Sequence, residues 1–96
     1  MTVKAIWNDQ ILAESTETIK LEGNQYFPAE AIQKEVLQNS NLHTTCPHKG
    51  EASYYNVVVD GKVNKDAAWY YPTPKKGYEN ITNHVAFWKG VQVTTE

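Results

Sequence analysis

The sequence predicts a single all-β domain, mostly antiparallel, with one short helix. The first observation is that apolar and polar residues alternate along many short segments, as they do in a strand with one face buried. The second is that residue pairs suited to tight hairpin turns separate these segments. The third is that apolar residues recur at helical spacing in one segment only. Together these observations predict a meander of antiparallel hairpins within residues 1–96.

Six segments show the alternation of a half-buried strand, and tight turns are expected between them. The alternating apolar residues are, in chain order, Val3/Ala5/Trp7, Ile11/Ala13, Ile19/Leu21, Ala67/Trp69/Tyr71, Val85/Phe87 and Val91/Val93. The expected turns are at residue pairs that tolerate a positive φ, namely Asn8-Asp9, Gly23-Asn24, Asp60-Gly61 and Lys89-Gly90.

One segment has the spacing of a helix rather than of a strand. Ala29, Ile32 and Val36 follow Pro28 at helical intervals, and the polar run Asn39-Ser40-Asn41 ends the pattern. The sequence therefore predicts a short helix between Pro28 and this polar run.

Two further segments have a distinct composition. The nearly continuous apolar and aromatic run Tyr54–Val59 predicts a central strand whose two faces are both covered. The stretch Pro72–Gly77 contains two prolines, two lysines and a glycine. Prolines at this density are incompatible with regular structure, so this stretch is expected to be a surface loop.

Length and composition favour one domain over residues 1–96 that folds alone or as a small homo-oligomer. The hydrophobic fraction of 41% supplies more apolar surface than a disordered segment carries. Nine lysines and eleven acidic residues give a net charge of -2, and arginine is absent. Because no positive field is available to attract phosphates, we expect neither a nucleic-acid partner nor a membrane partner.

Cys46 is the only cysteine, so no internal disulfide forms and a structural zinc site of several thiolates is excluded. A reducing cytoplasm fits a lone thiol best. The N-terminal segment Met1–Trp7 leads directly into the polar residues Asn8–Gln10, with no apolar run fit for a signal peptide or a membrane span. We therefore expect a cytoplasmic protein.

The segment Thr45–Gly50 concentrates reactive groups in a tight turn. Pro47 presets φ at the start of the turn, and Gly50 provides a position free of Cβ hindrance. Lys49 would lower the pKa of the Cys46 thiol if the two side chains converged. Cys46 and Lys49 are therefore the candidates for a catalytic role. The alternative for Cys46 is a small buried hydrophobe at a strand end.

The positive charge of Lys49 has two possible roles. Together with the backbone N–H groups at Gly50, the ammonium would form an anion-binding corner; the alternative is that Lys49 is a solvated lysine of the turn. His48 lies at the tip of the turn, where an exposed imidazole is expected. A metal site made of Cys46, His48 and His84 has only the Cys-x-His spacing in its favour. We therefore expect no metal ion, and no motif predicts a cofactor.

Several motifs along nearly the whole chain resemble those of a known family. They are Tyr26-Phe27-Pro28, Thr45–Tyr54, Ala67–Pro72 with Pro74, and Val85-Ala86-Phe87. The most specific part is the Cys-Pro-x-Lys-Gly core followed by Trp-x-Tyr-Pro. These motifs resemble the domain of unknown function 427 family, often labelled a nucleotidyltransferase. The resemblance implies two antiparallel sheets that meet in a tent-like sandwich with a cleft between them, similar to methionine sulfoxide reductase B and the ligand-binding domain of cereblon.

The resemblance also implies a set of site residues. The positions that map onto the family's motifs are Cys46, Lys49, Gly50, Tyr54, Trp69 and Tyr71. Of these, the four with side chains suited to contacting a ligand are Lys49, Tyr54, Trp69 and Tyr71. Glu22 is a further candidate because relatives also carry a glutamate there, and it would be able to form an ion pair with Lys49.

Three functions remain open from the sequence. The first is a domain that binds a small molecule in an aromatic cleft next to Lys49. The second is an enzyme that uses Cys46 as a thiolate, or a nucleotidyltransferase-like activity. The chain has neither an Asp-x-Asp pair for Mg²⁺ nor a Gly-rich phosphate loop, which counts against nucleotidyl transfer. The third is a non-enzymatic structural or protein-interaction module.

Overall fold

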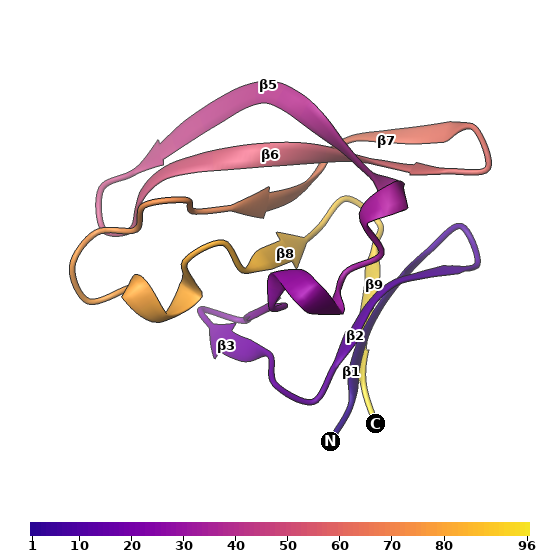
Figure 1. The fold of residues 1–96 in the computed structure, drawn as a ribbon, viewed down its shortest axis with the longest axis horizontal. Coiled ribbons are helices and arrows are strands. Elements are labelled where there is room, and N and C mark those ends of the chain that lie inside the picture. Colours follow the sequence, from indigo (N-terminus) through magenta and orange to yellow (C-terminus); the bar gives the residue numbers. More distant parts are fainter.

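In the computed structural model, which describes residues 1–96, the chain forms nine strands and three short 3₁₀ turns (Figure 1). The strands are β1 (Val3–Trp7), β2 (Gln10–Ser15), β3 (Ile19–Leu21), β4 (Asn24–Tyr26), β5 (Leu37–Cys46), β6 (Gly50–Val59), β7 (Lys62–Tyr70), β8 (Val85–Phe87) and β9 (Gln92–Thr95). The 3₁₀ turns are η1 (Ala29–Ala31), η2 (Lys34–Val36) and η3 (Glu79–Ile81). None of the helical segments has the length and apolar character that crossing a membrane requires.

The strands form three antiparallel sheets, with the orders β2-β1-β9, β3-β4 and β5-β6-β7-β8. The all-β, antiparallel class predicted from the sequence is therefore confirmed. Three sheets form where two were expected, because the short β3–β4 hairpin joins β8 only through a bridge between Phe27 and Val85. In Figure 1 the strands of the three-stranded sheet run across the direction of β5, β6 and β7.

Tight turns lie where the sequence predicts them, although the one at Lys89-Gly90 joins β8 to β9, strands of different sheets, and so closes no hairpin. Both residues have a positive φ in Asn8-Asp9 (52° and 62°), Asp60-Gly61 (50° and 77°) and Lys89-Gly90 (54° and 86°). The fourth turn lies one residue earlier than predicted. It is formed by Glu22-Gly23, with φ of 53° and 82°, and Asn24 already begins β4. Two successive positive φ values match the right-handed twist of the flanking strands.

The predicted helix after Pro28 is wrong, because the structure has only the two 3₁₀ turns η1 and η2 there. Between them Ile32 is extended, with φ of -104° and ψ of 137°. Its backbone bridges to Ala13 of β2, and its side chain is buried in the main core. An isolated helix of this length is marginal, so a sheet contact and core burial outweigh the local spacing.

Strand β5 was not delimited by the sequence analysis, which placed a strand end at Cys46 but ended the predicted helix at Asn39–Asn41. The strand covers Leu37–Cys46 at the edge of the four-stranded sheet, and most of its side chains are exposed. Because the strand buries little of its own surface, its residues do not alternate between apolar and polar. The predicted loop at Pro72–Gly77 is present, since these residues lie in no strand or helix.

The four-stranded sheet has apolar side chains on both faces. One face contributes to the main core, a cluster of 13 buried residues that also includes residues of β1 and β2. The other face contributes to a smaller cluster made of Tyr26, Ala52, Tyr71, Ile81 and Ala86. Along β6, Tyr54 packs against the smaller cluster and Tyr55 against the main core. Successive residues of a strand point to opposite faces, so β6 packs on both. Within the predicted run, however, the buried residues Val57 and Val59 share one face, and the other face is only partly covered.

Candidate functional site: an aromatic cleft around an ion pair

The turn between β5 and β6 holds Lys49 in a fixed position. Gly50 has a φ of 108°, and a Cβ atom at this residue would lie 3.5 Å from the Thr73 carbonyl oxygen. The backbone N–H of Lys75 donates to the Lys49 carbonyl over 2.9 Å. The Lys75 ammonium donates to the Pro47 carbonyl over 3.0 Å. Two hydrogen bonds to the neighbouring loop and a residue that must be glycine therefore fix this turn.

The side chain of Lys49 points inward and is only 8% exposed. Its Nζ lies 2.5 Å from Oε1 of Glu22, whose side chain is 55% exposed. Nζ also lies 3.7 Å from Cys46 Sγ and 5.7 Å from the centre of the Tyr78 ring. The hydrogen bond to Glu22 is the main reason that the pKa of Lys49 is raised, against the opposing effect of burial. The ion pair between Glu22 and Lys49, to which the family resemblance pointed, is therefore present, and Lys49 is charged.

Glu22 reaches Lys49 from the tip of the β3–β4 hairpin. Its φ of 53° lies in the left-handed region, where a glutamate is uncommon. Gly23 completes the tight turn and β4 follows directly. The hairpin turn thus aims a carboxylate at a lysine that is distant in sequence, which no local pattern reveals.

Aromatic rings form the walls of a cleft of about 200 Å³ beside this ion pair. Its lining residues are Glu22, Asn24, Tyr26, Lys49, Tyr54, Trp69, Tyr71 and Trp88. Trp69 packs edge-on against Tyr26 and against Trp88, with ring centres 6.2 and 5.9 Å apart. Its indole N–H donates to the Tyr26 hydroxyl over 3.3 Å. Burial raises the pKa of the Tyr71 hydroxyl to about 12, so this phenol is neutral.

All five residues proposed from the sequence as ligand contacts line this one cleft. They are Glu22, Lys49, Tyr54, Trp69 and Tyr71. Of the other three lining residues, Tyr26 was named only as part of a family motif, and sequence reasoning missed Asn24 and Trp88. The alternation of Val85 and Phe87 contained a signal for Trp88. It places Ala86 and Trp88 together on the opposite side of the chain, and Ala86 belongs to the cluster beneath the cleft. Asn24 was assigned to a turn, and no signal pointed to it.

Cys46 lies next to the cleft without lining it. Its half-buried sulfur contacts Lys49 Nζ, so the two catalytic candidates do converge. Backbone N–H groups directed at the sulfur, that of Lys49 first and that of His48 second, lower the pKa of the Cys46 thiol. His48 is exposed, and His84 Nδ1 is hydrogen-bonded to the Thr82 carbonyl. No three side chains of His, Cys, Asp or Glu are grouped so that they could hold a metal ion.

The fold and the cleft define a class: a small all-β domain in which an aromatic cleft on one face of a four-stranded sheet contains a buried, ion-paired lysine. The chain belongs to the family described as a domain of unknown function (DUF427), whose family model matches residues 1–96. No curated protein matches the sequence.

Proposed function

We propose that the aromatic cleft binds a small, planar, uncharged molecule. The observation that supports this most directly is that side chains from the β3–β4 hairpin, the Lys49 turn, β6, β7 and the end of β8 line one cavity. Ligand sites are typically concave and mostly apolar, with a few polar groups that orient the ligand. The cavity of about 200 Å³ is smaller than the roughly 300–1,000 Å³ of drug-sized sites. It suits a single ring with a short polar substituent.

The charges of the cleft favour a neutral ligand. Glu22 and Lys49 neutralise each other, and no other charged side chain lines the cleft. This pairing argues against the anion-binding corner considered for Lys49. A primary amide carries an acceptor for the ammonium and donors for the carboxylate side by side. A net charge on the ligand would attract one partner and repel the other.

The test uses three probes that share one ring: benzamide, benzoate and benzylammonium. Binding is followed in two-dimensional NMR through the indole N–H resonances, because Trp69 and Trp88 line the cleft while Trp7 packs against the main core. We expect benzamide to shift the signals of Trp69 and Trp88, to leave that of Trp7 unchanged, and to bind more tightly than either charged probe. Equal or tighter binding of benzoate would refute the neutral-ligand proposal.

A pair of matched variants locates the binding. Asn24→Trp fills the cleft from its rim and should abolish the benzamide shifts. Gln25→Trp adds the same bulk at the neighbouring position of β4, which points to the opposite face. It should leave benzamide binding intact. If both variants behave alike, or if wild type does not respond to any probe, an interaction module becomes the better reading.

We propose a reaction of the Cys46 thiolate as a second candidate function. It is supported by the contact of 3.7 Å between Sγ and Lys49 Nζ, together with the lowered pKa of the thiol. A thiolate is the reactive form of cysteine, and a cation beside it favours that form. Alkylation of Cys46, described in the Discussion, tests this candidate separately from the cleft.

A further inference from the structure

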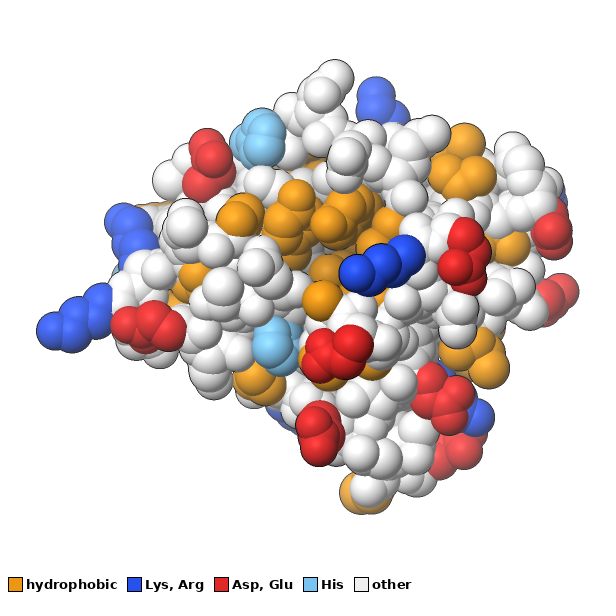
Figure 2. Space-filling model, in the orientation of Figure 1, with side chains coloured by type: hydrophobic (Ala, Val, Ile, Leu, Met, Phe, Trp, Pro, Cys, Tyr) orange, Lys and Arg blue, Asp and Glu red, His pale blue; other side chains and the backbone are white.

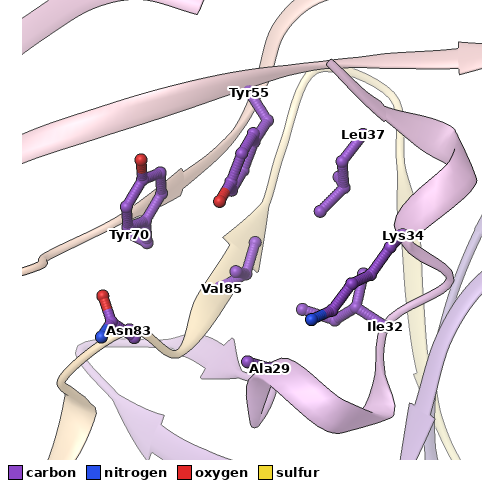
Figure 3. Close-up of a pocket in the computed structure, with 8 residues that line it drawn as sticks. All are labelled: Ala29, Ile32, Lys34, Leu37, Tyr55, Tyr70, Asn83 and Val85. Atoms are coloured by element: carbon purple, nitrogen blue, oxygen red, sulfur yellow. The ribbon is translucent and has the colours of Figure 1, made fainter. Parts of the chain in front are cut away.

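A second and larger hollow lies on the other face of the four-stranded sheet. Its volume is about 380 Å³, and six of its eight lining residues are hydrophobic. Figure 3 shows Tyr55 and Tyr70 on one side of this hollow, Lys34 and Ile32 on the other, and Val85 between the two sides. In Figure 2, hydrophobic atoms form the exposed floor of a hollow in the same region. Unlike the cleft at Lys49, this hollow has the volume of an ordinary ligand site.

Strand geometry separates the two sites. Tyr54 and Tyr55 are neighbours on β6, and Trp69 and Tyr70 are neighbours on β7, so each pair points to opposite faces of the sheet. Tyr54 and Trp69 line the cleft at Lys49, whereas Tyr55 and Tyr70 line the hollow. No residue lines both. The hollow is thus an independent site rather than an extension of the cleft.

The walls of the hollow suit a flat apolar body. The rings of Tyr55 and Tyr70 are stacked, with centres 4.7 Å apart and an angle of 19° between their planes. Both rings and Leu37 are only partly buried and pack against the main core. Burial raises the pKa of the Tyr55 hydroxyl, so this hydroxyl carries no charge. A planar ligand here would extend the core and cover apolar surface that water now contacts.

One charge is available to orient such a ligand. Lys34 is the only charged residue that lines the hollow, and in Figure 3 its amino group is turned toward the cavity. The two ion pairs of the structure involve Lys4 and Lys49, so Lys34 has no acidic partner. Glu35 follows it in the chain without lining the hollow. The amide of Asn83, across the cavity, adds a neutral polar group.

We propose that this hollow binds a small aromatic monocarboxylate, with its ring beside Tyr55 and Tyr70 and its carboxylate paired with Lys34. The inference does not depend on the proposed function of the Lys49 cleft. The two sites also differ in the charge they prefer, because the cleft is electrically neutral and the hollow has one unpaired cation.

The experiment compares 2-naphthoate with 2-naphthamide, which have the same ring system and differ in charge. On wild type, both probes should shift the backbone amide resonances of Tyr55, Tyr70 and Val85. An exposed ion pair strengthens binding modestly, so we expect 2-naphthoate to bind about two- to fivefold more tightly than 2-naphthamide. Equal affinities, or shifts confined to the indole signals of Trp69 and Trp88, would overturn the proposal.

Three variants complete the test. Lys34→Gln should remove the preference for 2-naphthoate, while the matched exposed-lysine variant Lys62→Gln should retain it. Ala29→Trp places an indole at the exposed rim of the hollow and should abolish binding of both naphthyl probes. The indole N–H signals of Trp69 and Trp88 should keep their wild-type positions in Ala29→Trp, which shows that the fold and the cleft on the other face are intact. A preference that survives Lys34→Gln would refute the role of Lys34, whatever the behaviour of Ala29→Trp.

Discussion

The substitution Glu22→Gln removes one charge of the cleft and leaves the ammonium of Lys49 where it is. Lys49 would then have lost its carboxylate and would keep the glutamine amide oxygen, the Cys46 sulfur and the Tyr78 ring. Burying a charge without a counter-charge is unfavourable, and the Lys49 side chain is only 8% exposed. We therefore expect Glu22→Gln to lower the free energy of unfolding.

The expected magnitude follows from the burial of the two partners. Exposed ion pairs contribute about 0.2–1 kcal/mol, whereas breaking a buried pair costs about 3–5 kcal/mol. Here the lysine is buried, but the Glu22 side chain is 55% exposed, so solvent screens the pair. We expect a loss of about 1–2 kcal/mol, between these two ranges. The matched control is Glu96→Gln, which breaks the more exposed, 3.5 Å pair with Lys4 and should cost less than about 0.5 kcal/mol.

Urea unfolding, followed by Trp fluorescence, measures both variants. The double variant Glu22→Gln/Lys49→Met also removes the buried cation and should recover part of the lost stability, since the two effects are coupled. The pKa of Lys49 is raised in the folded state, so the contribution of the pair is complete below the ordinary lysine pKa of about 10.4. As far as the lysine is concerned, it is lost as the pH rises above that value toward the higher pKa of the folded state. A Glu22→Gln variant as stable as Glu96→Gln would refute this reasoning.

Three further predictions concern the turn, a buried phenol and the thiol. Gly50→Ala should lower the free energy of unfolding by about 1–3 kcal/mol, because alanine is strained at a φ of 108°, and unchanged urea stability would contradict this. The pKa of Tyr71 is raised from 10.0 to about 12, because burial disfavours the ionised phenol. The fold should therefore lose at most about 3 kcal/mol of stability through Tyr71 as the pH rises from about 10 to about 12. Tyr71→Phe should therefore lose less stability than wild type over that interval, and equal losses would rule out Tyr71 as the cause. The rate at which iodoacetamide alkylates Cys46 should rise with pH, with a midpoint below the pKa of about 8.5 of a free cysteine. Lys49→Met should keep most of this lowering of the pKa, because the backbone N–H of residue 49 is its main cause. A midpoint at or above that value would count against a reactive thiol.

The strands and turns were predictable to the extent that their signals are local. The alternation in Val3–Trp7 and the turn pair Asp60-Gly61 depend on neighbouring residues only, and both predictions are confirmed. The helix predicted after Pro28 failed because Ile32 gains more from the bridge to β2 and from burial than from one turn of helix. The sequence indicated only the end of strand β5 at Cys46, because an exposed edge strand needs no apolar face.

The site was predictable as a set of residues, not as a geometry. The motif around Lys49 and the segment at Trp69, together with the family resemblance, identified five of the eight residues that line the cleft. Nothing in the sequence showed that Trp88 would stand edge-on to Trp69, or that the larger hollow exists on the opposite face. Both depend on how separate strands align.

The sequence by itself determined the all-β class, the positions of most strands and turns, and the side-chain chemistry available to the cleft. Only the tertiary structure decided that Glu22 reaches Lys49, and that Tyr54 and Tyr55 belong to different cavities. The physical reason is that alternation places adjacent side chains on opposite faces of a strand but does not say what covers each face. That depends on strand register, and on the β3–β4 hairpin and the 3₁₀ segments that pack on the sheet.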